Sequence, residues 1–589
     1  MAAKQTHIIV GGGLAGLMAT IKLAEAGHKV QLFSIVPVKR SHSVCAQGGI
    51  NAAMNLKGEG DSPLEHFDDS IYGGDFLANQ PLVKRMCETA PAIINLLDRM
   101  GVMFNRTPEG HLDFRRFGGT KYSRTAFAGA TTGQQIIYAL DEQVRRFEVE
   151  GFVEKFETWE FLSAVMDNEP RCRGIVAMDL KSMGVRAFTA DAVMLCTGGP
   201  GLIFGKSTNS MICTGGAASS VFQQGVFYAN GEFIQVHPTA IPGQDKLRLM
   251  SESARGEGGR MWTYKDGKPW YFLEEWYPAY GNLVPRDIAS RAIHKVVHEM
   301  GLGVDGKAIV YLDVSHIDKE QLDRKLKGIL EIYERFVGLD PRKVPMMVFP
   351  AVHYSMGGIW VDNENQMTNI PGLFAAGECD YQYHGANRLG ANSLVSAIFG
   401  GLIGGPAMIK YASSGIKPVQ DQMIFSKEVK RQEEFNNKLL KSDGPENIGK
   451  LHDELGDIMS KNVTVVRYNK KLEETDQAIQ KLQERFKKIS LNDPSDYSNM
   501  ALTYARQLFN MLILARVITR GALLRNESRG AHYKPDFPER DDKNFLKTTK
   551  AKFTPSGPEF SFEAVDTSLI PPRPRKYDVE KKATTKGTP

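Results

Sequence analysis

Residues 6–34, with the sequence THIIVGGGLAGLMATIKLAEAGHKVQLFS, decide the fold of this chain. Apolar runs at 6–10 and 29–34 predict two short buried strands, and a glycine turn follows the first of them. Between the runs, apolar side chains recur on one face of a predicted helix: Leu14, Leu17, Met18 and Ile21. The order of strand, glycine turn, helix and strand predicts a dinucleotide-binding unit.

The glycine turn supplies four candidate cofactor contacts: Gly11, Gly13, Ala15 and Gly16. Gly11 permits the tight turn, Gly13 lets the backbone approach a pyrophosphate, and Gly16 lets helix and sheet pack closely. The helix N-terminus adds N–H donors and partial positive charge. A second match to the glycine pattern, at 301–306, follows a predicted helix and precedes a strand, so we interpret it as a surface turn. One dinucleotide is therefore expected.

Two features further along narrow the choice of cofactor. Ser34 ends the second strand, where many dinucleotide folds carry an acidic residue for the ribose; this weakens a nicotinamide interpretation and leaves the adenosine contact open. Residues 40–50, RSHSVCAQGGI, put His42 where a flavin ring would lie, and Gly48 and Gly49 follow in the same segment. A histidine at that place can be a covalent cofactor anchor. The alternative is a surface or helix-capping histidine.

Composition indicates a large soluble enzyme, because 42% of the 589 residues are apolar, enough for ordinary cores in more than one domain. The formal net charge is +5, but residues 571–589 hold six Lys and Arg against Asp578 and Glu580, so +4 of it (6 − 2) lies in that stretch. The rest of the chain is nearly neutral and shows no recognised nucleic-acid-binding motif. Nucleic-acid binding is therefore not predicted.

The six cysteines are scattered, with no CxxC and no spacing suited to zinc or an iron-sulfur cluster, so we predict no metal site and a reducing compartment. Few residues precede the first strand, from which we expect no secretory segment and a place on the cytoplasmic side. Residues 389–408 are apolar and long enough to span a membrane, but they are glycine-rich and contain Asn392, Ser393 and Ser396. We expect a helix buried in the cofactor domain there.

Later segments divide the chain. Residues 192–199 and 373–378 resemble further buried strands that run into glycine turns, as in a sheet assembled from distant parts of the sequence. Between them, about 233–352 changes to Trp- and Pro-rich composition, which indicates an inserted domain. Residues 425–533 are helical in pattern, and the proline-containing stretch from 571 is expected to be an extended arm or a disordered tail.

At this point the chain resembles the flavoprotein subunits of the succinate dehydrogenase and fumarate reductase family. The matching motifs occur in order along the sequence: GGGLAGL at 11–17, RSHSVCAQGGI at 40–50, HPT at 237–239, SESARGEGG at 251–259, PRD at 285–287, HYSMGG at 353–358, AAGE at 375–378, HGANRLGANSL at 384–394 and RGAHYKPDFPERDD at 529–542. A single match would be weak, but the ordered set is highly specific.

The resemblance implies an α/β fold, with a glutathione-reductase-type, Rossmann-like FAD-binding domain, an inserted α+β capping domain and a C-terminal helical domain. The domains expected on this basis are 1–232 with 353–424 for FAD, 233–352 for the cap, 425–535 for the helical domain, and 536–589 for a C-terminal segment with a basic tail.

The resemblance also implies a grip on a small dicarboxylate, succinate or fumarate. Its residues here would be His237, Ser251, His353 and Arg388, with Phe117 packing over the substrate. An arginine can pair with a carboxylate through two bonds, while the others donate single bonds. A plainer role is also open for each residue: His237 beginning a loop, His353 satisfied in a core, Arg388 bridging to Glu378, and Phe117 as a core aromatic.

For the reaction, the family assigns the proton acceptor to an arginine, here Arg286, with Glu252 and Arg255 relaying the proton outward. A guanidinium is a poor base, because its reference pKa lies above about 12. The assignment therefore requires concerted transfer toward Glu252. The alternative is that Arg286 only stabilises developing charge while another group moves the proton.

For the cofactor, the resemblance implies FAD bound covalently through His42, with Glu378 near the ribityl chain and Ser393 and Leu394 at a helix N-terminus beside the flavin ring. Two departures from the family pattern stand out. Gly216 takes the place at which many relatives carry an acidic residue after a glycine, so contacts there are open. Ser251 replaces an expected threonine, although the hydroxyl survives.

Finally, the resemblance implies partners: an iron-sulfur subunit that accepts the electrons and a cytochrome b membrane anchor that holds the chain at the cytoplasmic face of the cell membrane. Succinate oxidation with quinone, as in the tricarboxylic acid cycle and electron transport, is the first choice, and quinol-driven fumarate reduction is the alternative. A soluble L-aspartate oxidase is a further enzyme candidate, disfavoured by His42. A non-catalytic flavin-binding assembly module is the candidate of another class.

Overall fold

The N-terminal unit folds as its sequence pattern predicts. The computed structural model describes residues 5–243, 247–415 and 421–577. Strand β1 (Thr6–Val10), helix α1 (Leu14–Glu25) and strand β2 (Lys29–Ser34) follow one another, and β1 and β2 pair in parallel. The apolar side chains of both strands and of α1 are buried, which is why the short runs form strands here.

A five-stranded parallel sheet collects strands from distant parts of the chain, in the order β19-β10-β1-β2-β6. The added strands are β6 (Val153–Glu157), β10 (Ala192–Leu195) and β19 (Leu373–Ala375). The strands expected at 192–199 and 373–378 therefore form, but end earlier, because the chain turns at Gly198 and Gly377, whose φ angles are 74° and 83°.

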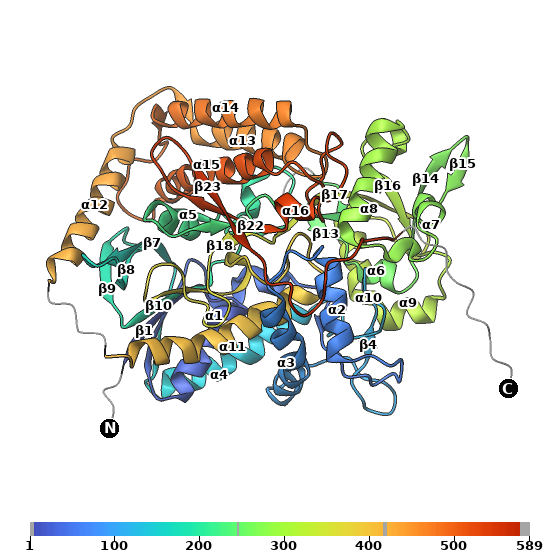
Figure 1. Ribbon diagram of the computed structural model, residues 1–589, viewed down its shortest axis with the longest axis horizontal. Helices are drawn as coiled ribbons and strands as arrows, with labels where there is room; N and C mark the ends of the chain where they lie inside the picture. The colour runs from blue at the N-terminus through green and yellow to red at the C-terminus, as the bar shows by residue number, and fades with distance from the viewer. Residues whose placement is uncertain (1–4, 244–246, 416–420, 578–589) are drawn as a thin grey trace.

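Helices cover this sheet. Helix α11 (Asn392–Ala412) packs along α1, and α4 (Thr132–Val149) lies beside α1 in the same layer (Figure 1). Other elements of this part of the molecule are α2 (Pro63–Gly73), α3 (Gln80–Arg99), α5 (Gly216–Gln223), and the strands β3 (Ile50–Asn51), β4 (Phe114–Arg115), β5 (Thr125–Ala126), β7 (Trp159–Met166), β8 (Cys172–Asp179) and β9 (Val185–Thr189).

The middle of the chain builds a second, largely antiparallel sheet with its own core. Its order is β13-β12-β17-β16-β14-β15, and Figure 1 shows it with its helices as a separate lobe at the right. The elements are β12 (Ile234–Ile241), β13 (Arg248–Leu249), α6 (Ser253–Gly256), β14 (Arg260–Lys265), β15 (Lys268–Trp270), α7 (Phe272–Trp276), α8 (Arg286–His294), β16 (Val310–Asp313), α9 (Lys319–Lys325), α10 (Lys327–Val337) and β17 (Met346–Ser355).

A group of helices follows, as the pattern of 425–533 predicts. They are α12 (Met423–Leu440), α13 (Ile448–Asn462), α14 (Asn469–Phe486) and α15 (Met500–Leu524). Strands β20 (Glu446–Asn447) and β21 (Ile489–Ser490) join their ends, and α16 (Asp542–Phe545) follows. The hairpin of β22 (Lys547–Lys552) and β23 (Glu559–Ala564) then returns to a sheet with β11 (Tyr228–Ala229) and β18 (Gly358–Ile359).

Two helices are long and apolar enough to cross a membrane by length and composition, α11 and α15. Most of the tested window of each is buried inside the fold, 61% for α11 and 72% for α15. The helix expected near 389–408 is thus α11, and it packs against the parallel sheet as a core helix. The similar character of α15 was not anticipated from the sequence.

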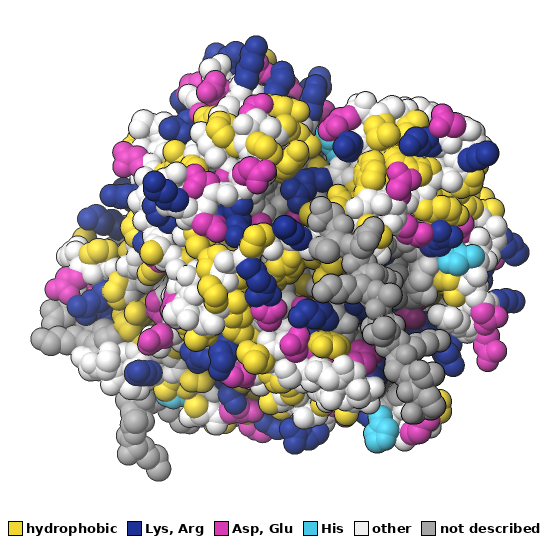
Figure 2. All heavy atoms as spheres, turned by 45° about the vertical axis from the view of Figure 1, so that its right-hand side comes forward, with side chains coloured by type: hydrophobic (Ala, Val, Ile, Leu, Met, Phe, Trp, Pro, Cys, Tyr) yellow, Lys and Arg dark blue, Asp and Glu magenta, His cyan; other side chains and the backbone are white. Residues whose placement is uncertain are grey.

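The stretch from 571 begins as an extended arm bound to the fold. Arg573 pairs with Asp68 of α2 at 2.6 Å, and Arg575 pairs with Asp287 of α8 at 2.6 Å. Tyr577 is 4% exposed. Of the two alternatives, an extended arm or a disordered tail, the tail is therefore wrong for residues 571–577, because Arg573 and Arg575 pair with carboxylates of the fold and Asp287 is buried. Residues 578–589 lie outside the described part. On the face drawn in Figure 2, basic and acidic side chains are interspersed.

Candidate active site

One cavity lies at the carboxyl ends of the parallel strands, between the sheet and the second lobe. Of the cofactor, substrate and relay residues singled out in the sequence, all except Gly16 and Arg255 line it. A Cβ on Gly16 would lie 1.9 Å from the carbonyl oxygen of Gly11, so Gly16 serves close packing, as expected. Arg255 stands one layer behind the cavity wall, against Glu252.

The glycine turn leaves room for a phosphate. Gly11 has φ 115°, and a Cβ there would lie 2.1 Å from the carbonyl oxygen of Cys196. Gly13 caps α1 without a side-chain hydrogen bond, so the first N–H groups of the helix face the cavity beside Ala15. Ser34 ends β2 in the cavity wall, buried. This cradle fits the pyrophosphate of FAD.

His42 stands in the cavity wall, in the short 3-10 helix His42–Cys45. The backbone N–H of Ser210 donates to its Nδ1 at 3.2 Å, and Nδ2 of Asn209 lies 3.3 Å from its Nε2. Asn209 also donates to the carbonyl oxygen of His353 at 3.3 Å. The imidazole is therefore held in one orientation and linked to strand β17.

The glycines after His42 are constrained by close neighbours. A Cβ on Gly48 would lie 2.9 Å from the ring of Phe117, and one on Gly49, whose φ is 134°, would lie 2.5 Å from the carbonyl oxygen of Ala126. Arg115 donates to the carbonyl oxygen of Gly48 from its Nε at 3.0 Å. Phe117 is buried and packs on this turn, so it is at once a core aromatic and part of the cavity wall.

Glu378 and the start of α11 line another part of the cavity. Burial raises the pKa of Glu378 to about 7, and its Oε1 accepts from the N–H of Ser355 at 3.0 Å. Ser393 and Leu394 lie in the first turn of α11, whose N-cap, Ala391, has φ 63°. Their position brings the positive end of the α11 dipole to the cavity.

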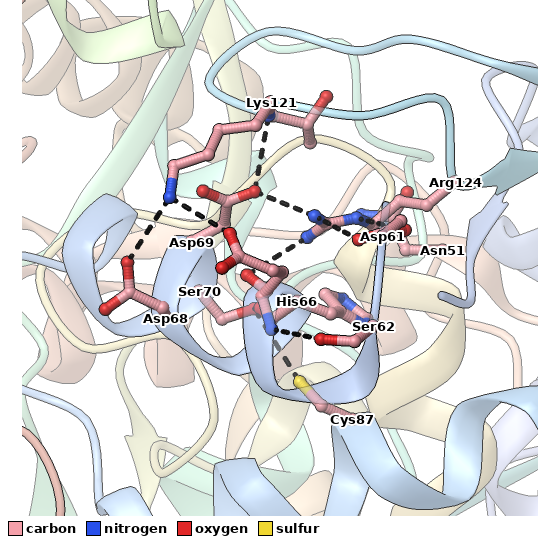
Figure 3. Close-up of polar contacts among 12 residues, drawn as sticks. Asn51, Asp61, Ser62, His66, Asp68, Asp69, Ser70, Cys87, Lys121 and Arg124 are labelled. Carbon is pink, nitrogen blue, oxygen red and sulfur yellow. Dashed lines mark hydrogen bonds and ion pairs between the residues drawn. The ribbon is translucent and has the colours of Figure 1, made fainter. Parts of the chain in front are cut away.

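The N-terminus of α11 rests on a buried polar cluster. Asn392 accepts from Asn51 at 2.7 Å, lies 2.9 Å from Nε2 of His66, and donates to Ser70 at 2.9 Å. Beside it, Figure 3 shows Arg124 between two carboxylates, at 2.8 Å from Asp61 and 3.0 Å from Asp69. This cluster fixes the first turn of α11 against the cavity.

The expected dicarboxylate residues converge at the other end of the cavity. The rings of His237 and His353 lie 5.0 Å apart, and Ser251 is buried with its Oγ 2.9 Å from Oγ of Ser253. Arg388 lies over the ring of Tyr354 at 4.3 Å. Within the described residues Arg388 forms no ion pair, so the bridge to Glu378 considered from the sequence does not form.

Among the described residues, two buried polar atoms at this end find no hydrogen-bond partner, Nε2 of His237 and Nε of Arg388. Burial and the charge of Arg286 lower the pKa of His237 well below its usual range, and the same causes act on His353. They also lower the pKa of Arg388 to about 9. Neutral imidazoles and a cationic guanidinium with open donors suit a carboxylate ligand.

A buried network of ion pairs links this end to the second lobe. Arg286 donates to Oε2 of Glu252 from Nε at 2.9 Å and from Nη2 at 2.7 Å, and Arg255 donates to Oε1 at 2.7 Å. Burial alone would raise the pKa of Glu252, but the charges of Arg286 and Arg255 outweigh it and lower that pKa. Glu252 is therefore an ionised bridge between two guanidinium groups.

Two residues of this end were missed in the sequence. Gln235 accepts from Nη1 of Arg286 at 2.9 Å and donates to the carbonyl oxygen of Arg388 at 2.8 Å. It stands two residues before His237 on β12, on the same face, and this spacing was a usable signal. Tyr354, under Arg388, follows His353 directly and carried no such signal.

Family models match most of the chain: the FAD binding domain over residues 6–394, and the fumarate reductase flavoprotein C-terminal model over residues 452–577. A Bacillus subtilis succinate dehydrogenase flavoprotein subunit is 67% identical over 99% of this chain and 100% of its own length. An Escherichia coli fumarate reductase flavoprotein subunit is 35% identical over 98% and 97%. A solved chain of an E. coli quinol fumarate reductase variant superposes with TM-score 0.91, at 34% identity over 98% and 99%.

Fold and cavity thus define an FAD-dependent oxidoreductase, and the expected α/β fold with a capping lobe is confirmed. The chain belongs to the family of succinate dehydrogenase and fumarate reductase flavoprotein subunits. Its similarity over the full length puts its function with the succinate dehydrogenase members.

Proposed function

We propose that this chain interconverts succinate and fumarate on FAD bound covalently through His42. The proposal depends on two features that meet at one cavity. His237 and Arg388 present polar atoms that find no partner among the described residues, and Arg286, Glu252 and Arg255 form a buried ion-pair network beside them. When bound, FAD supplies an acceptor for the hydride of succinate.

The residues of the grip have distinct roles in this proposal. Arg388 pairs with one carboxylate through its fork, while His237, His353 and Ser251 hold the substrate by single hydrogen bonds. The imidazoles stay neutral in the cavity, so each can present an N–H without adding charge beside Arg286. Phe117 covers the substrate from the side of the Gly48 turn.

The proton released from succinate passes, in this proposal, to Arg286 and from it to Glu252 in a concerted step. Both hydrogen bonds from Arg286 to Oε2 of Glu252 are already formed, so a proton lost by one end of the guanidinium is replaced without rearrangement. Arg255 holds the opposite oxygen and favours passage outward. If Arg286 only stabilised developing charge, a lysine in its place would keep most of the activity.

Arg286→Lys tests the relay because it retains the charge and loses the fork. We expect kcat to fall by about 100-fold or more, the range of general acid–base effects. The matched control is Arg291→Lys on the same helix, where the side chain is partly exposed and pairs with Asp287. Near-normal turnover of Arg286→Lys would favour simple charge stabilisation.

The covalent link is supported by the fixed imidazole of His42 in the cavity wall. Acid precipitation of the purified protein is expected to leave flavin fluorescence with the polypeptide, and the His42→Ser variant is expected to release all of its flavin. Flavin that leaves the unmodified chain on denaturation would exclude the covalent link while leaving FAD binding intact.

The chain functions as a subunit of a membrane-bound quinone oxidoreductase complex. We infer that an iron-sulfur subunit takes its electrons, that a cytochrome b anchor holds it at the cytoplasmic face, and that succinate oxidation is its physiological direction. Purification from native membranes, with identification of co-purifying subunits, tests these three inferences.

Two simple assays of the isolated chain test the substrate. With an artificial electron acceptor, we expect steady turnover of succinate and none of L-aspartate. Steady oxidation of L-aspartate without turnover of succinate would indicate an L-aspartate oxidase. No turnover of either compound by a flavin-loaded chain would indicate a non-catalytic flavin-binding assembly module.

The division into domains remains a proposal, with the same bounds as those expected from the sequence. It is supported by the six-stranded sheet, whose strands lie between Ile234 and Ser355, so that the last strand, β17, runs three residues past the proposed boundary at 352.

A further inference from the structure

The missing acidic residue at Gly216 leaves a question about the adenosine end of the cavity. Ser34, Trp159, Glu160, Gly216 and Gln507 line the cavity together, away from the substrate grip. Ser34 carries no carboxylate, and Gly216 carries no side chain. The two positions that often supply an acidic group to a dinucleotide therefore supply none here.

The space beside Gly216 is filled from another element. A Cβ on Gly216 would lie 2.2 Å from Oε1 of Gln507, a residue of α15. Gln507 donates to Oε1 of Glu160 and accepts from the hydroxyl of Thr214, which in turn accepts from the N–H of Gly216 at 3.2 Å. A chain of hydrogen bonds thus runs from the start of α5 to the carboxyl group of Glu160.

Glu160 itself is incompletely satisfied. It is 3% exposed, and its Oε2 finds no hydrogen-bond partner in the part of the chain that the structure describes. It belongs to β7, which lies beside β2, with the rings of Phe33 and Trp159 6.2 Å apart. A buried carboxyl oxygen without a partner costs free energy unless a ligand donates to it.

We propose that Glu160, held by Gln507, is an FAD-binding residue that accepts a hydrogen bond from the adenosine half of the cofactor and replaces the acidic groups absent at Ser34 and Gly216. The donor is either a ribose hydroxyl or the exocyclic amine of adenine. This inference rests on the proposed use of FAD and is independent of the covalent link and of succinate turnover.

The test uses the full-length His42→Ser variant, in which flavin is exchangeable. The variant is stripped of flavin and then titrated with FAD, ADP and FMN. Glu160→Gln is expected to weaken FAD and ADP binding by about 10-fold, the range for one hydrogen bond lost between buried groups. FMN, which lacks the adenosine half, is expected to bind unchanged, and this separates a lost contact from a damaged fold. Glu154→Gln, exposed on neighbouring β6, is the matched control.

Two further arms sharpen the result. In the His42→Ser parent, 2′-deoxy-ADP binds more weakly than ADP if the ribose donates, and inosine diphosphate does so if adenine donates. Adding Gly216→Asp and Gln507→Ala to Glu160→Gln is expected to restore ADP affinity, because the carboxylate returns at the other position. Equal FAD and ADP affinities in Glu160→Gln and its parent, or an equal loss for FMN, would overturn the proposal.

Discussion

At the scale of single residues, the substrate end of the cavity depends on one carboxylate between two guanidinium groups. Glu252 accepts from Arg286 and Arg255 and is 1% exposed. Removing its charge leaves two cations buried together without their counterion, and breaking a buried ion pair in this way costs about 3–5 kcal/mol.

We therefore expect Glu252→Gln to lower the free energy of unfolding in urea by that order, besides abolishing the relay. The pKa of Glu252 is lowered in the folded state, so its stabilisation is present above the unfolded pKa and is lost as pH falls through the folded value, below 4.5. The difference between the two proteins should consequently shrink in acid. A difference that is constant across this acid range would contradict the assignment.

A second residue-scale prediction concerns Arg388. Arg388→Lys keeps a cation but loses the planar fork and the stacking on Tyr354. We expect KM for succinate to rise by about 10-fold or more, with a smaller change in kcat, because one bond of a bidentate pair is lost. Steady-state kinetics at saturating acceptor measure KM and kcat separately. A fall in kcat alone would indicate that Arg388 acts in the chemical step and not in substrate binding.

The residues of the grip could be predicted from the sequence because each stands in a short, distinctive motif. Gln235 was missed although its place two residues before His237 on β12 was a usable signal. Tyr354 was missed because its role depends on stacking with Arg388 from a distant part of the chain, which no local pattern encodes. Glu160 was missed for the same reason: its partner Gln507 lies 347 positions away.

At the scale of elements, the first turn of α11 is held through Asn392 by Asn51, His66 and Ser70, and the buried ion pairs of Arg124 with Asp61 and Asp69 lie beside these residues. Burial raises the pKa of Asp69 to about 6, although the charge of Arg124 acts to lower it. In Arg124→Gln that lowering is lost, and the buried carboxyl groups of Asp61 and Asp69 lose the cation that they share, which leaves the charge of Lys121 to act on Asp69.

We expect Arg124→Gln to be less stable than the unmodified chain by about 3–5 kcal/mol at pH 7.5 or so. Because a raised pKa means that the folded state binds the proton more tightly, the variant should regain stability as pH falls from above about 6 toward the unfolded value near 3.8. Urea midpoints from neutral to mildly acidic pH measure this, and a midpoint that moves in parallel with the unmodified chain would refute it.

At the scale of the whole molecule, sequence patterns located most elements but not their neighbours. The unit of β1, α1 and β2 is local, so the spacing of its apolar residues and its glycines were sufficient to predict it. The places of β6, β10 and β19 in the sheet are set by pairing across most of the chain, and the order β19-β10-β1-β2-β6 follows only from packing. The arm at 571–577 looked like a polar tail because its partners belong to α2 and α8.

That arm joins the flavin-binding part to the second lobe, and its two arginines permit a matched comparison. Arg575 bonds both oxygens of Asp287, the neighbour of Arg286 at the start of α8, at 2.6 and 3.0 Å, and is nearly buried. Arg573 pairs with Asp68 at the surface, with 43% of its side chain exposed. An exposed pair contributes about 0–1 kcal/mol, whereas loss of a buried partner leaves a carboxylate dependent on its remaining cation, Arg291.

We therefore expect Arg575→Ala to increase hydrogen exchange at the start of α8 and to lower kcat by several-fold, because the backbone that carries Arg286 loses a fixed point. Arg573→Ala is expected to change neither quantity measurably. Exchange mass spectrometry of the intact chain, with turnover measured on the same preparations, distinguishes the two variants. Equal effects would mean that the arm acts only as a surface strap, and no effect from Arg575→Ala would mean that α8 is held by the second lobe alone.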